Sequence, residues 1–129
     1  MLKIGLVGRE QTIVNLSKCA SNIGSGTLEV FSTPSLAALM EAAAVNSLQN
    51  ALPEGQTTVG TMLEIRHTSA TPIGMTVGAQ SELVEIDGKR LVFKITAYDT
   101  VGVIGTATHE RMIVDGARFM KKAEAKRHA

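Results

Sequence analysis

Glu41 is the residue whose position in this chain most suggests chemistry, because it is a single carboxylate inside the apolar stretch 33–45. An ionised carboxylate enclosed by such a helix is costly unless it is paired, so it should shift its pKa or find partners. One interpretation is structural: Glu41 faces solvent or a subunit boundary and is satisfied by an arginine or a lysine. The other is catalytic, since carboxylates in unusual environments concentrate at active sites.

His67 is the candidate partner for that carboxylate. By strand parity His67 shares a face with Leu63 and Ile65, which predicts that it points towards the core. A lone buried histidine is most often a hydrogen-bonded structural residue. However, the same sheet face should meet the helix that carries Glu41, and a carboxylate converging with an imidazole suits general acid–base or nucleophilic chemistry.

Thr33 precedes Pro34 and is therefore predicted to be the N-cap of the apolar helix. Its functional alternative is a hydroxyl at the positive end of the helix, where a developing anion is stabilised. Eight residues of continuous helix separate Thr33 from Glu41 by about 12 Å along the axis. The two side chains should therefore not touch: either the regular helix starts later, or they contact different parts of a substrate.

Two further residues give weaker signals. Gly60 interrupts a predicted strand, which indicates either a bulge or a close backbone approach to a ligand. Arg111 belongs to the triplet 109–111 on the last predicted strand, where charges usually mark an exposed or edge face. Alternatively, Arg111 reaches an acyl or phosphate group across a subunit boundary.

Two familiar kinds of site are not predicted. The segment 3–8 resembles the first strand of a dinucleotide-binding fold, but the glycine fingerprint and the helix that should follow it are missing. The three histidines, at 67, 109 and 128, lack helical metal-ligand spacing, and Cys19 is the only cysteine. We therefore expect no metal site and no disulfide.

The elements that must position these residues follow from the hydrophobic period. An extended segment is expected over 4–14, a loop with a short helical turn over 15–28, and a strong helix from Thr33 until residues 53–55 stop it. From residue 56 the period changes to two, which predicts consecutive antiparallel strands joined by tight turns, with a corner at 71–74 and a hairpin at 87–88. Residues 115–129 suit a mostly polar terminal helix or tail.

A helix that is apolar nearly all round should be enclosed, and the simplest enclosure is an antiparallel sheet curled around it, an α+β fold. One helix and one sheet of this size leave a strand edge and apolar surface that a second copy would cover. We therefore expect at least a dimer.

Composition narrows the class of protein. The 129 residues suit one domain, and the net charge of +1 gives no general attraction to nucleic acid or to a membrane surface. Aromatic residues make up 3% of the chain, too few for the stacking platforms of single-strand binders. Neither a signal peptide nor a bilayer-spanning run is apparent. We expect a soluble cytoplasmic protein.

Five short segments, taken in their order and spacing, resemble the fluoroacetyl-coenzyme A thioesterase family. They are residues 29–33 (EVFST), 39–41 (LME), 59–61 (VGT), 67–72 (HTSATP) and 105–111 (GTATHER). The resemblance covers the chain from about Ile4 to Val114. It implies the hot-dog fold, in which an antiparallel sheet wraps a long helix, and a dimeric thioesterase.

The resemblance also implies roles for individual residues. Thr33, Glu41 and His67 match the family's catalytic set, Gly60 matches the glycine that approaches the acyl group, and Arg111 matches the substrate-contacting arginine. Coenzyme A would then be part of the substrate, with no cofactor and no metal.

One departure from the family pattern bears on the substrate. The family enzyme carries a phenylalanine-containing lid upstream, where this chain has Gly-Ser-Gly-Thr at 24–27. This favours hydrolysis of short-chain acyl-CoA thioesters over selectivity for a fluorinated acyl group. The alternatives are a hydratase or dehydratase acting on acyl thioesters, and a non-catalytic acyl-CoA-binding module.

Overall fold

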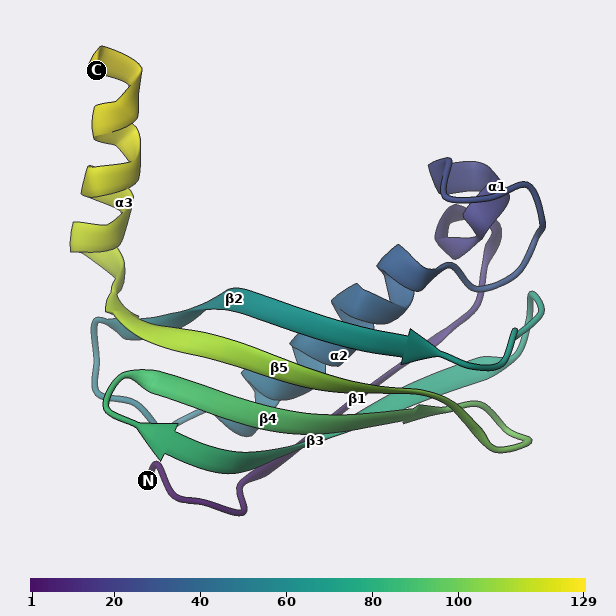
Figure 1. Ribbon diagram of the computed structural model, residues 1–129, viewed down its shortest axis with the longest axis horizontal. Coiled ribbons are helices and arrows are strands. Elements are labelled where there is room, and N and C mark those ends of the chain that lie inside the picture. Colours follow the sequence, from purple (N-terminus) through teal and green to yellow (C-terminus); the bar gives the residue numbers. More distant parts are fainter.

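The computed structural model describes residues 1–129 and shows a five-stranded antiparallel sheet with one long helix against it (Figure 1). The strands lie in the order β1-β3-β4-β5-β2, so β1 and β2 form the two edges. The predicted α+β architecture is confirmed. The bounds of the strands are β1 (Val7–Ile13), β2 (Gln56–His67), β3 (Thr76–Asp87), β4 (Arg90–Tyr98) and β5 (Val103–Asp115).

The long helix α2 (Thr33–Ser47) forms where the sequence predicts it, but its cap is different. Ser32, and not Thr33, is the N-cap: its side chain accepts a hydrogen bond from the backbone N–H of Ser35 at 3.2 Å. Ser32 and Thr33 are both good capping residues, so the sequence alone cannot place the cap to the residue. The consequence is functional, because the hydroxyl of Thr33 is left for another partner.

One side of α2 packs into the core against β1 and β3. A glycine is required where helix and strand meet, because a Cβ on Gly8 would lie 2.1 Å from the carbonyl oxygen of Ala43. Ser81 donates a hydrogen bond to the same carbonyl at 2.9 Å. The buried side of the helix consists of Leu36, Leu39, Met40, Ala43, Ala44 and Ser47.

The prediction of consecutive hairpins is wrong at one step. β2 pairs with β5 and not with β3, so residues 68–75 cross from one edge of the sheet towards the other. The predicted corner lies within this crossing, where buried Thr71 donates to Asp99 at 2.9 Å and accepts from the N–H of Phe31. Turn signals mark where a strand ends, but they do not say which strand it pairs with.

The remaining elements are short or peripheral. The loop after β1 contains η1 (Leu16–Lys18) and α1 (Ala20–Ile23), and the chain ends in α3 (Gly116–Glu124) and η2 (Ala125–His128). α3 follows directly from β5, stands away from the sheet and buries none of its residues (Figure 1). No helix in the structure is long and apolar enough to cross a membrane.

Candidate active site

The predicted site residues form two groups at different positions along α2. The first group joins the start of α2 to the end of β2: Thr33 Oγ1 lies 2.8 Å from His67 Nδ1. Since Ser32 caps the helix, the Thr33 hydroxyl is free to make this contact. A hydroxyl and an imidazole at this distance have the geometry of a nucleophile, or a proton donor, beside its base.

The other ring nitrogen of His67 is unusual. Nε2 is buried and makes no hydrogen bond within the chain. Burial lowers the pKa of His67, an effect that the nearby backbone of Ser69 opposes. The neutral imidazole is therefore favoured near neutral pH, as a general base requires. Buried polar atoms without a partner are rare in native structures, so this nitrogen is a place where a further contact would form.

The second group gathers around Glu41, in the middle of α2. Its Oε2 lies 3.3 Å from Arg111 Nη1 and 4.0 Å from His109 Nε2. Gly60 on β2 lies directly beneath, since a Cβ there would be 2.7 Å from Oε2. The expectation of an enclosed carboxylate is wrong for the single chain: 43% of the Glu41 side chain is exposed, on the outward side of α2.

Arg111 is held from several sides. Its Nε donates to Thr58 Oγ1 at 2.8 Å and its Nη2 to the Thr58 carbonyl at 3.1 Å, while Nη1 faces Glu41 and His109. Burial lowers the pKa of Arg111, and the Glu41 carboxylate acts in the opposite direction. One of the two interpretations placed this residue on an exposed or edge face. It is buried because β5 is an interior strand, between β4 and β2, and Arg111 lies on its inner face, against Glu41 of α2.

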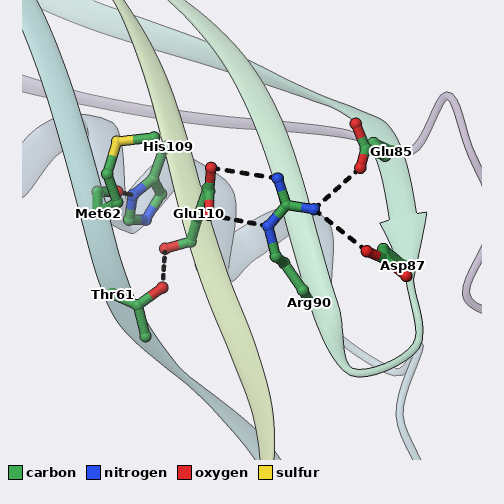
Figure 2. Close-up of polar contacts among 7 residues, drawn as sticks. All are labelled: Thr61, Met62, Glu85, Asp87, Arg90, His109 and Glu110. Carbon is green, nitrogen blue, oxygen red and sulfur yellow. Dashed lines mark hydrogen bonds and ion pairs between the residues drawn. The ribbon is translucent and has the colours of Figure 1, made fainter.

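His109 is a member of the second group that the sequence analysis missed. Its Nδ1 lies 2.7 Å from the Met62 carbonyl (Figure 2), and its Nε2 lies 3.2 Å from Arg111 Nη1. A carbonyl only accepts and a guanidinium only donates, so His109 must be neutral with its proton on Nδ1. Burial lowers the pKa of His109, consistent with that state. The signal in the sequence was the spacing of 109 and 111, which puts both side chains on one face of a strand.

Gly60 lies at a bulge, one of the two features proposed for it. The pairing of β2 with β5 shifts register between Gly60 and Met62, which leaves Thr61 as the extra residue of a bulge. Thr61 Oγ1 instead donates to the Glu110 carbonyl at 3.2 Å (Figure 2). The bulge therefore lies beside Glu41, where the missing side chain of Gly60 makes room for the carboxylate.

Glu41 and His67 do not meet within one chain, contrary to the expected convergence. Strand parity predicts the face of β2 on which His67 lies but not its place along the strand. His67 is seven residues beyond Gly60, about 20 Å in an extended strand. α2 is regular from Thr33 onwards, so the separation of about 12 Å between Thr33 and Glu41 along the axis also holds.

A cavity of about 290 Å³ opens beside the first group, and Thr33 and His67 are among its lining residues. Ser25, from the segment 24–27, lines the same cavity. No set of three or more His, Cys, Asp or Glu side chains is placed to hold a metal ion.

The fold defines the class of protein to which the chain belongs. The fold is the hot-dog fold: a solved hot-dog-like protein from Thermanaerovibrio acidaminovorans matches with a TM-score of 0.86 and 26% identity, over 95% of this chain and 91% of that one.

The family follows from the sequence comparison. Residues 14–117 match the family of fluoroacetyl-CoA-specific thioesterases, and the chain belongs to that family of thioester hydrolases. The fluoroacetyl-CoA thioesterase of Streptantibioticus cattleyicolor is 39% identical over 98 residues, which cover 76% of this chain and 70% of the relative. A solved fluoroacetyl-CoA thioesterase has a TM-score of 0.91 and 31% identity, over 98% of both chains. A structure of a variant of the fluoroacetyl-CoA-specific enzyme contains fluoroacetate and CoA.

Proposed function

We propose that this protein hydrolyses short-chain acyl-CoA thioesters. The observation that carries the proposal is the contact of 2.8 Å between the Thr33 hydroxyl and the imidazole of His67 at the positive end of α2. A hydratase would have no chemical task for that hydroxyl. Membership of a thioesterase family supports the same reaction.

In the proposed reaction His67 is the base. It accepts a proton from water or from the Thr33 hydroxyl, the resulting oxygen attacks the thioester carbonyl, the carbon–sulfur bond breaks, and His67 returns the proton to the CoA thiolate. Attack by water gives the acid directly. Attack by Thr33 gives an acyl-threonine ester, which a water molecule activated by His67 then hydrolyses to the acid. A backbone N–H at the bulge beside Gly60, where Thr61 is left out of the sheet ladder, would polarise the carbonyl oxygen. Glu41, oriented by Arg111, either stabilises the protonated form of His67 or attacks the thioester carbonyl itself.

The separation within one chain bears on how these residues work together. A single thioester cannot contact both Thr33 and Glu41 of the same helix at about 12 Å. We therefore propose a homodimer in which each site takes Thr33 and His67 from one subunit and Glu41 and Gly60 from the other.

The free edge of β2 supports this dimer. β2 is a long edge strand, and Met62, Leu63 and Ile65 on it are only partly buried. If two copies of β2 pair antiparallel with the partner's Gly60 opposite His67, and the bulged Thr61 is left out of the pairing, the two-fold axis passes through Glu64, close to the middle of the strand. Residues directly opposite in such a pair share a face, so the partner's Glu41 would approach the unpartnered Nε2 of His67.

The outward side of α2 would be covered in the same dimer. This side carries Ala38 and Val45, both exposed, on either side of Glu41. A second copy would remove this apolar surface from water and enclose the carboxylate, as the sequence led us to expect. The single cysteine, free and buried at Cys19, suits the reducing cytoplasm, where we place the enzyme.

The reaction is tested with a panel of acyl-CoAs and detection of free thiol. We expect release with short acyl groups, and a loss of roughly 100-fold or more in His67→Ala and in Glu41→Ala. Absence of thiol release from every acyl-CoA, with binding still measurable, would favour the binding module. Release unchanged by either substitution would exclude these residues from the site.

The shared site is tested with mixed dimers. His67→Ala and Glu41→Ala chains are co-expressed with different affinity tags, and the dimers that carry both tags are isolated. If each site draws on both subunits, every mixed dimer has one intact site and recovers about half of the wild-type activity. If the residues act within one chain, the mixed dimers stay as inactive as their parents, and the shared site is wrong.

A further inference from the structure

The largest described cavity lies away from both groups of site residues. It has a volume of about 620 Å³ and is formed where α3 leaves the sheet, opposite the turn between β3 and β4. Four cationic side chains and one carboxylate, Asp115, line it, with Phe119 and Ala125 as its apolar members. The cations are Lys89, Arg118, Lys121 and Lys122.

The charge of this region contrasts with that of the rest of the chain. The last fifteen residues hold five of the thirteen Lys and Arg side chains and two of the twelve acidic ones, Asp115 and Glu124. The Asp115 carboxylate accepts a hydrogen bond from the backbone N–H of Arg118. Glu124 pairs with Arg127, outside the cavity. The side chains of the four lining cations form no ion pair. Like charges gathered without partners repel one another, so a bound anion would relieve that repulsion.

The cavity also lies within reach of the second group of site residues. Lys89 is in the turn between β3 and β4, and its carbonyl accepts a hydrogen bond from the N–H of Ile113 on β5. Arg111, which orients Glu41, is four residues before Asp115 at the end of the same strand, a distance of about 13 Å. An extended pantetheine arm can span that gap.

We propose that this cavity binds the nucleotide end of coenzyme A, namely adenosine with its 3′-phosphate and 5′-diphosphate. The proposal rests on the acyl-CoA thioesterase function proposed above and names where that substrate is held. Arginine and lysine are the residues that bind phosphates, and Phe119, whose side chain is exposed beside them, offers a ring on which an adenine can stack. Substrate affinity then depends on α3, at a distance from the chemistry.

The experiment compares two double variants on the same helical end of the chain. Lys121→Ala with Lys122→Ala removes two cations from the cavity, whereas Lys126→Ala with Arg127→Ala removes two cations outside it. Each is assayed with an acyl-CoA and with the same acyl group on N-acetylcysteamine, a thioester that lacks the nucleotide. We expect the cavity variant to raise KM for the acyl-CoA about tenfold, and to leave hydrolysis of the truncated thioester unchanged. An unchanged KM, or an equal rise in both variants, would overturn the proposal.

Direct binding separates failure of this proposal from failure of the proposed function. The probe is 3′-phosphoadenosine 5′-phosphate, titrated by calorimetry. If no acyl-CoA is hydrolysed but the wild type binds the probe and only the cavity variant loses binding, the nucleotide site stands while the reaction does not. If the wild type ignores the probe and instead sediments with vesicles containing phosphatidylserine, the basic surface serves a membrane and the proposal is wrong.

Discussion

The two faces of strand β5 carry charged groups of very different character. On the inner face, His109 and Arg111 are buried, and Arg111 contacts both His109 at 3.2 Å and Glu41 at 3.3 Å. On the outer face, Glu110 pairs with Arg90 at 2.9 Å, and Arg90 also meets Glu85 (Figure 2). Adjacent residues of one strand thus serve two networks, one desolvated and one in contact with water.

The two networks differ in their contact with water. Water screens the outer ion pairs, so they need no exact arrangement and contribute little to the stability of the fold. The inner groups have lost water, and each polar atom there needs a defined partner. This is why the inner face fixes one tautomer of His109 and one orientation of the Arg111 guanidinium. Such a fixed arrangement suits a site that must present a carboxylate in one position.

The largest effect is expected from Arg111→Met. It removes the donors to Glu41, His109 and both oxygens of Thr58, and leaves the buried Nε2 of His109 unpaired. We expect a loss of about 3 kcal/mol in the free energy of unfolding, and activity lower by roughly 100-fold because Glu41 is no longer held. Denaturant titration and thiol release measure the two. Arg9→Met, at an exposed arginine of the edge strand β1, is the control, and equal effects in both variants would contradict the comparison.

A smaller effect, on activity more than on stability, is expected from Gly60→Ala. The added Cβ would lie 2.7 Å from Glu41 Oε2 and 3.3 Å from Arg111 Nη1. The carboxylate is the mobile end of a half-exposed side chain, so it can move aside at little cost in stability. We expect thiol release to fall roughly tenfold because the carboxylate is displaced. Gly102→Ala is the matched control, since a Cβ there meets nothing within 4 Å. A structure of the variant with Glu41 unmoved would remove the reason for the prediction.

Much of this arrangement could be predicted from the sequence, and the limit was strand pairing. Pro34 and the apolar spacing predicted α2, and the period of two predicted the strands. No local pattern shows that β2 pairs with β5, and that pairing brings Gly60 beneath Glu41 and beside Arg111. His109 was missed for the same reason, because a histidine beside charged neighbours indicates a surface until its strand is known to be interior.

Protonation of the inner face gives a third, more moderate effect. Burial lowers the pKa of His109 in the folded protein, whereas the unfolded chain has its ordinary value of about 6.5. Below that pH the unfolded state binds more protons than the folded state, so stability falls as the pH falls from about 6.5 towards the lower folded pKa. The slope is at most about 1.4 kcal/mol per pH unit for one histidine.

His109→Gln isolates this contribution. The glutamine cannot become charged, so the free energy of unfolding of this variant should depend less on pH below about 6.5. The amide oxygen of the glutamine can still accept a hydrogen bond from Arg111. Because burial also lowers the pKa of His67, the His67→Asn variant should show a similar decrease in slope. Denaturant titrations of the three proteins between pH 7.5 and about 5 measure the effect. If the free energy of unfolding of His109→Gln depended on pH as steeply as that of the wild type, this histidine would not resist protonation.

The smallest effect is expected on the outer face. Arg90 holds the pKa of Glu110 below its usual range through a hydrogen bond at 2.9 Å, and Arg90 keeps a second acidic partner in Glu85. In Glu110→Gln the amide still accepts from Arg90, and water replaces what is lost, so thiol release should be unchanged and the denaturation midpoint should move only slightly. Raising the salt concentration should weaken the outer pair in the wild type in the same way, because screening acts on exposed charges.

If Glu110→Gln instead lowered thiol release as much as Gly60→Ala, the outer network would have to reach the site, through the Thr61 hydroxyl bonded to the Glu110 carbonyl. A double variant with Thr61→Val would then show non-additive losses, and the two faces of β5 would act as one unit.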